Sequence, residues 1–280
     1  GYDRADQTRL RNLGRAVVAA FAVALAFLLV EEASGHAVKN GLYKVLPFLA
    51  PDAKHVRAVG DGLIGATYLT NRSIAMMVAL LGPVLLMAHY VLQGAWRTAA
   101  LSGLPVLALL TALASQHESS QLGLAAAAVI LVLGIVRWRA ALWLVAAGWV
   151  AANALVVPVV QGLYAMNLHQ ASWLPYSAKA RVILWNYTAE QVARHPLVGV
   201  GLVSTRVLDE RRMASATTRP GHVFPQRTGP HAHNIYLQTW YELGLVGALL
   251  LTALGLAVIA AIARLTEVSR PYALATFDGV

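Results

Sequence analysis

The sequence has no cysteine and few charged residues, and both shortages restrict what the protein can be. Of its 280 residues, 12% are charged and 58% are hydrophobic, whereas a soluble domain is about a quarter charged. Without cysteine, neither a disulfide nor a thiolate metal site is possible. The missing charge leaves long apolar runs, each about long enough to cross a ~30 Å hydrocarbon core as a helix. These runs predict an integral membrane protein.

Several motifs that handle phosphate or metal are also missing. The segments between the runs contain no Asp-rich motif for Mg²⁺ or Mn²⁺, no phosphate-binding Gly-Lys-Ser loop and no Gly-x-Ser-x-Gly nucleophile elbow. We therefore predict neither a bound metal nor a cofactor. Any phosphate handling has to rest on arginine side chains.

The pattern of the apolar runs predicts an all-α fold, a polytopic transmembrane helix bundle, because strand alternation is absent. Six spans cover roughly residues 16–30, 73–92, 99–114, 122–136, 140–160 and 243–262. Three regions follow: five transmembrane helices with short loops over residues 1–160, a long loop with short helices over 161–242, and the sixth span with the start of a further apolar segment over 243–280. We expect the chain to be part of a larger bundle.

The arginines of the short links orient this bundle. The N-terminal stretch and the links after spans two, four and six carry arginine, and all four fall on one side of the membrane. Short positive loops stay in the cytoplasm, so residues 31–71 and 161–242 lie outside. Within the first of these segments, an apolar stretch over residues 42–50 could lie along the membrane surface.

The long outer loop is basic, with eight Lys or Arg residues against four Asp or Glu residues, within a net charge of +9. Long loops are exempt from the positive-inside rule, so this charge needs another reason. One reason is a solvated surface that touches anionic lipid headgroups, and the other is a pocket for a pyrophosphate or an acidic glycan. In a membrane protein such charge indicates phosphate-bearing partners rather than nucleic acid.

The sequence His-Ala-His-Asn at residues 231–234 lies near the end of this loop. A helix that begins near Asn234 places His233 at its mouth, with Tyr236 and Trp240 following at helical spacing. These residues could simply anchor the helix at the interface. A neutral imidazole at a membrane face is also well suited to general-base chemistry. Zinc on His222, His231 and His233 is a weaker alternative, because no adjacent carboxylate or third fixed spacing supports it.

Two arginines are candidate phosphate ligands. Arg181 and Trp185 are four residues apart on a predicted helix that His195-Pro196 should end. Arg181 either snorkels from a surface helix or binds a phosphate in a bidentate manner. Arg72 lies at the outer mouth of the second span, where a snorkelling arginine is common. The topology places Arg72 on the same side of the membrane as Arg181 and His233.

Together these residues resemble the O-antigen ligase and polymerase superfamily of bacterial envelope glycosyltransferases. The family signature, His-(Asn/Ser/Gln), nine residues and Gly-x-x-Gly, is met by His233, Asn234, Gly244 and Gly247. A second block, an Arg followed by Trp and then Pro-Leu-x-Gly-x-Gly, is met by Arg181, Trp185 and residues 196–201. The resemblance covers about residues 71–265, and the ligase is the closer member through Asn71-Arg72 at the start of a span.

The resemblance implies a multi-pass enzyme of the bacterial inner membrane, with membrane lipids around it and its site facing the periplasm. The donor would be a glycan linked to undecaprenyl pyrophosphate, and the acceptor a sugar hydroxyl of the lipid A-core. His233 would accept the hydroxyl proton, Arg181 and Arg72 would bind the pyrophosphate, and a metal-independent attack would invert the anomeric centre. The remaining expected substrate-binding residues are Asn234, Trp185, Tyr236, Trp240, Arg206 and Arg211.

Three alternatives remain open at this point. An O-antigen polymerase or a protein O-oligosaccharyltransferase of the same superfamily would use the same chemistry on another acceptor. A non-catalytic membrane transporter would need polar residues inside its spans. Such residues are scarce here, with His89 the main exception, and the polar residues gather in the outer loop instead.

Overall fold

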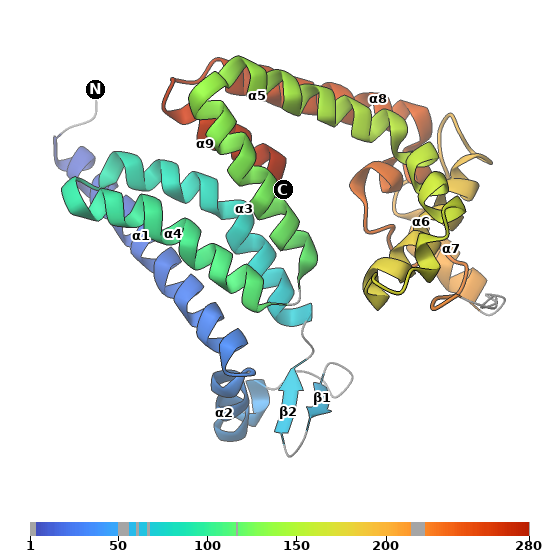
Figure 1. Ribbon diagram of the computed structural model, residues 1–280, viewed down its shortest axis with the longest axis horizontal. Coiled ribbons are helices and arrows are strands. Elements are labelled where there is room, and N and C mark those ends of the chain that lie inside the picture. Colours follow the sequence, from blue (N-terminus) through green and yellow to red (C-terminus); the bar gives the residue numbers. More distant parts are fainter. Residues whose placement is uncertain are drawn as a thin grey trace. The chain divides into compact units, whose positions relative to one another are not determined.

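The computed structural model describes residues 4–49, 56–59, 62–65, 68–115, 117–213 and 222–279. Two compact units make up the chain, one of residues 1–142 and 262–280 and the other of residues 143–261. Five helices are long and apolar enough to cross a membrane. The predicted class, a polytopic helical membrane bundle, is confirmed (Figure 1).

The first unit is built on three long helices that lie side by side: α1 (Arg4–Ala33), α3 (Tyr68–Val91) and α4 (Gly94–Ala114). A shorter helix, α9 (Ser269–Gly279), packs on α3. The buried faces of α1, α3 and α4 form one hydrophobic core, to which Leu25, Ile74 and Ala108 belong. Apolar side chains on the other faces are exposed, as lipid-facing positions of a membrane helix require.

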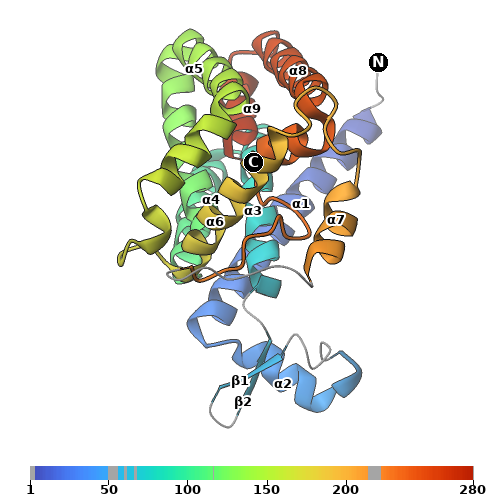
Figure 2. The same ribbon diagram turned by 90° about the vertical axis from the view of Figure 1, so that its right-hand side faces the viewer.

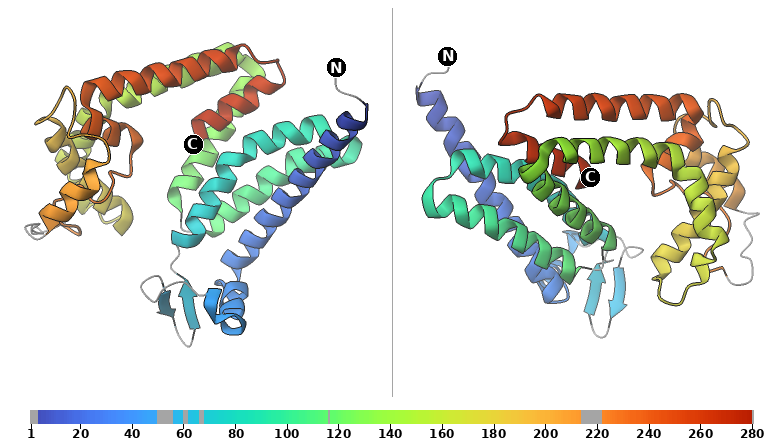
Figure 3. Two further views of the ribbon diagram at one scale, coloured as in Figure 1. Left: turned by 180° about the vertical axis from the view of Figure 1, so that it is seen from behind. Right: turned by 45° about the horizontal axis from the view of Figure 1, so that its top comes forward.

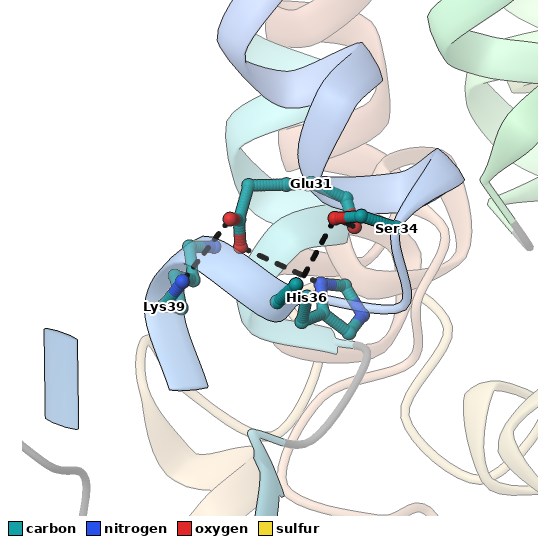
Figure 4. A network of polar contacts seen from close by, with 5 residues as sticks. Glu31, Ser34, His36 and Lys39 are labelled. Carbon is teal, nitrogen blue, oxygen red and sulfur yellow. Dashed lines mark hydrogen bonds and ion pairs between the residues drawn. The ribbon is translucent and has the colours of Figure 1, made fainter. Parts of the chain in front are cut away.

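The end of α1 is joined to α2 (Ala37–Val45) by a turn that a buried carboxylate holds (Figure 4). Glu31 is fully buried, and its Oε1 accepts a hydrogen bond from the backbone N–H of Lys39 over 3.1 Å. His36, the N-cap residue of α2, makes no side-chain capping bond. Glu31 therefore satisfies one of the backbone donors that the start of a helix leaves without a partner.

Beyond this turn, α2 has no buried side chain. The short helix η1 (Pro47–Leu49) follows it, so the apolar stretch expected along the membrane surface includes the end of α2 and η1, and residue 50 lies outside the described residues. A two-stranded antiparallel hairpin comes next, β1 (Val56–Val59) and β2 (Gly62–Gly65). The hairpin was not anticipated, and it is a small addition to an otherwise helical chain.

The fourth and fifth predicted spans are two arms of one 48-residue helix, α5 (Glu118–Ala165). A straight helix of this length would extend about 70 Å, more than twice the hydrocarbon thickness. Arg137 interrupts it with non-helical backbone angles (φ −144°, ψ 65°). The break lies in the arginine-bearing link that the sequence predicted between two spans.

In the second unit, the second arm of α5 lies beside α8 (Ile235–Ala263) (Figure 3). Asn153 Nδ2 donates to the Ala248 carbonyl over 2.7 Å, and Trp149 Nε1 donates to the Leu251 carbonyl over 3.3 Å. The loop between these helices contains η3 (Leu168–Gln170), α6 (Tyr176–Val192) and α7 (Ser204–Met213) (Figure 2). The long loop therefore contains short helices, as expected, and α6 ends before His195-Pro196.

Candidate active site

His233 lies two residues before the first residue of α8, at the mouth of the helix as the sequence predicted. Asn234 caps the helix, because its Oδ1 accepts the backbone N–H of Leu237 over 3.0 Å. His233 has left-handed backbone angles (φ 53°), which are uncommon for a residue other than glycine. Its side chain is exposed, and the centroids of the His231 and His233 rings are 4.0 Å apart. The imidazole is thus accessible from solvent, and it is carried by a residue in a left-handed backbone conformation.

Ala232, the residue between the two histidines, is held through both its carbonyl and its N–H group. Ala232 is fully buried. Trp185 Nε1 on α6 donates to the Ala232 carbonyl over 2.8 Å, and the Ala232 N–H donates to Gln238 Oε1 on α8 over 2.7 Å. With both polar groups of Ala232 engaged, His231 and His233 project from a fixed point of the backbone.

A second layer of hydrogen bonds holds Gln238 in turn. Gln238 Nε2 donates to Thr205 Oγ1 over 2.7 Å, and that hydroxyl donates to Glu242 Oε1 over 2.6 Å. Thr205 belongs to the first turn of α7 and is buried. Sequence reasoning missed Thr205, Gln238 and Glu242. The usable signal was Gln238, a polar residue inside the run of nine residues, one helical turn after the Asn234 cap.

Arg181 acts electrostatically on this site. Three effects lower the pKa of His233 from its ordinary value of 6.5: partial desolvation of the imidazole, then the neighbouring His231, then the positive charge of Arg181. Arg181 is half-buried on α6, four residues before Trp185. The positive charge of Arg181, about fifty residues earlier in the sequence, therefore reaches His233 and favours its neutral imidazole.

Two glycine-containing segments, residues 196–201 and residues 241–247, are joined by backbone hydrogen bonds. The N–H groups of Val200 and Gly201 donate to the carbonyls of Tyr241 and Glu242 over 3.0 and 2.9 Å. The Leu245 N–H in turn donates to the Pro196 carbonyl over 2.8 Å. These bonds replace those that α8 loses where Gly244 breaks it, since the φ of Gly244 is 61°.

Only glycine fits on either side of this contact. The φ of Gly199 is 66°, a value that other residues rarely adopt. A Cβ at Gly199 would collide with the backbone of Glu242 and Leu243, and a Cβ at Gly244 with the backbone of Leu197. The two motifs are therefore halves of one structural joint, which sets where the His233 end of α8 lies relative to α6.

The aromatic candidates on α8 contact the second arm of α5. Trp240 Nε1 donates to the Asn153 carbonyl over 2.8 Å, and the Tyr236 ring lies edge-on to Trp149 with centroids 5.3 Å apart. Both contacts fix α8 against α5. Their predicted contact with substrate stays a prediction.

The remaining arginine candidates are exposed side chains on α7 and α3. Arg206 is exposed on α7 and pairs with Glu210 over 3.1 Å, and Arg211 is exposed near the end of the same helix. Arg72 is exposed in the second turn of α3, in the first unit. Its predicted convergence with His233 stays a prediction.

His222 belongs to a different cluster from His231 and His233. Its Nε2 lies 3.1 Å from the Tyr164 hydroxyl, and its ring is edge-on to His169 at 5.0 Å between centroids. Across the described part of the chain, no group of three His, Asp or Glu residues is placed to hold a metal ion.

The family model described as O-antigen ligase matches residues 103–252, which is more than half of the chain. The chain belongs to the O-antigen ligase family. The match includes both motifs of this family, with His233 and Arg181, whereas Arg72 precedes it. No curated protein and no solved structure matches the chain significantly. Membership of the O-antigen ligase family supports a multi-pass membrane enzyme of the glycosyltransferase type that acts on lipid-linked glycans.

Proposed function

We propose that the protein is an O-antigen ligase that transfers a glycan from undecaprenyl pyrophosphate to a sugar hydroxyl of the lipid A-core. The observation that carries this proposal is the placement of His233, at a held turn, within electrostatic reach of Arg181. Family membership supplies the reaction class. By the positive-inside rule, the site would face the periplasm from a protein embedded in the bacterial inner membrane.

In the proposed step, a nitrogen of the neutral His233 imidazole accepts the proton of the acceptor hydroxyl. The hydroxyl oxygen attacks the anomeric carbon from the face opposite the leaving group. The bond between that carbon and the pyrophosphate oxygen breaks, so the anomeric centre inverts and undecaprenyl pyrophosphate leaves with its bonding electrons. A lowered pKa suits His233 to this role, because the base has to be unprotonated at neutral pH.

Arg181 would stabilise the negative charge that develops on the departing pyrophosphate. Arg72 would supply a second guanidinium from the mouth of its span. Asn234 caps α8, so we assign its side chain to positioning His233. Arg206 and Arg211 would attract acidic glycan to the loop.

The experiment that tests this proposal is transfer by purified protein, with lipid-linked glycan, lipid A-core and EDTA present. We expect His233→Ala to lower the rate by about 10²–10⁴-fold, the usual contribution of a general base. His195→Ala is the matched control, because His195 is exposed after α6. Full transfer by folded His233→Ala protein would refute the role of His233.

A polymerase would carry out the same chemistry with a growing glycan as acceptor. Replacing lipid A-core by a second lipid-linked glycan in the same assay separates the two activities. Product formation only with the lipid-linked acceptor would assign the polymerase reaction instead of the ligase reaction.

A further inference from the structure

The first unit contains an apolar groove between α1 and α4 that the proposed reaction does not use. Its volume is about 580 Å³ and its lining is almost entirely apolar, within the range of about 300–1,000 Å³ that is typical of small-molecule sites. The two helices that form it contact each other within one compact unit (Figure 1).

Small residues on both walls create the space. Ala19 and Ala22 line the α1 side, and Ala99, Ala100 and Gly103 line the α4 side. Glycine in a helix interior costs about 1 kcal/mol relative to alanine and is usually explained by close packing. That explanation fails for Gly103, because a Cβ there would meet no atom within 4 Å. Among the described residues, Gly103 therefore leaves open space in the wall of the groove.

One end of the groove is cationic. Arg15 lines it, and Arg11 lies one helical turn earlier on α1. The Nε groups of Arg11 and Arg15 both donate to the Val91 carbonyl, over 3.3 and 3.2 Å. Each of these bonds uses one of the five N–H donors of its guanidinium. Two positive charges are thus tethered at the point where the groove reaches the end of α3.

The same end has the features of a membrane interface. Trp96 lines the groove and is 78% exposed, and tryptophan gathers at the level of the lipid headgroups. Arg97 is exposed beside it on α4. Basic pockets between transmembrane helices bind the headgroups of anionic lipids. The apolar part of the groove would match the acyl chains of a phospholipid, and its cationic end would match an anionic headgroup.

We propose that this groove binds one anionic phospholipid of the surrounding bilayer. An acyl chain lies between α1 and α4 along Ala19 and Gly103, and the phosphate contacts Arg15 and Arg11. The site belongs to the leaflet on the Arg15 side of the bundle. The proposal is independent of the glycan-transfer reaction.

The test is native mass spectrometry of the full chain released from nanodiscs of equal phosphatidylglycerol and phosphatidylcholine content. We expect retention of phosphatidylglycerol in preference to phosphatidylcholine. Arg15→Gln should weaken phosphatidylglycerol binding about tenfold, the effect of losing one charged hydrogen-bonding group. Arg264→Gln, an exposed arginine outside the groove, is the control and should leave binding unchanged.

Gly103→Leu tests the apolar part of the groove. Leucine raises helix propensity and fills open space, so the protein should fold while retention of both lipids falls about tenfold. Gly148→Leu makes the same change at an exposed α5 glycine that also has no neighbour within 4 Å, and it should retain lipid normally. Ala19→Leu fills the groove from the opposite wall and should repeat the loss.

Equal retention of the two lipids by the wild-type chain would overturn the proposal. So would unchanged binding in both Gly103→Leu and Ala19→Leu, or a polypeptide found in the groove in place of lipid.

Discussion

Ala232, the residue between the two candidate histidines, links them to α6 and α8. Its carbonyl accepts from the Trp185 indole, and its N–H donates to Gln238. The position of His233 therefore depends on residues that have no direct part in proton transfer. This dependence leads to predictions that separate positioning from chemistry.

Trp185→Phe keeps the aromatic ring and removes the indole donor. The buried Ala232 carbonyl would lose its partner, which costs about 1–3 kcal/mol, and the misplaced His233 should lower kcat by about tenfold to a hundredfold. Kinetics of glycan transfer with the purified variant measure this loss. Trp173→Phe is the control, since Trp173 is 74% exposed. Equal kcat values for the two variants would contradict the positioning role.

His231→Asn tests the electrostatic neighbourhood of His233. The neutral imidazole is the proposed base, so kcat/KM should rise with pH along an acid limb and then level off. His231 contributes to the lowering of the His233 pKa, and its removal should raise that pKa. The acid limb should consequently move to higher pH in a pH–rate profile, and a limb that stays in place or moves lower would argue against the assignment.

At the scale of elements, local signals placed the start of α8 and the end of α6 correctly, whereas the first four predicted spans and the sixth began four to twelve residues after the helices that contain them. The Asn234 cap predicted where α8 begins, and His195-Pro196 predicted the end of α6, because both signals act on the backbone within one turn. The β1–β2 hairpin and the Gly244 break were not predicted. The break depends on a partner segment about forty-five residues earlier, and local sequence does not encode that contact.

Gly244→Ala tests the joint between this break and residues 196–201. The change forces a side chain into a left-handed conformation and against the Leu197 backbone, so we expect destabilisation by at least ~3 kcal/mol. Thermal unfolding in detergent measures the effect.

Gly148→Ala serves as the comparison for Gly244→Ala, because this α5 glycine has open space around its Cβ position. Its replacement should be neutral or stabilising by up to about 1 kcal/mol. A Gly244→Ala protein as stable as the Gly148→Ala protein would show that the joint tolerates a side chain.

At the scale of the whole molecule, orientation in the membrane is the property that the site most depends on. The absence of cysteine makes single introduced cysteines direct reporters of topology. We expect Val207→Cys, on the exposed face of α7, to react with an impermeant maleimide added to intact spheroplasts. Gln93→Cys, in the exposed link before α4, should react only after the membrane is permeabilised, and the reverse pattern would invert the topology.

The sequence by itself determined the membrane class, the approximate spans, the start of α8 and the family motifs. These features depend on hydrophobic length and on contacts within one or two helical turns. Only the tertiary structure decided that the Trp185 indole holds Ala232, that Thr205 and Glu242 support Gln238, and that Gly244 packs on the Leu197 backbone. Residues far apart in the sequence make those contacts, and their pairing depends on the path of the whole loop, which no local pattern specifies.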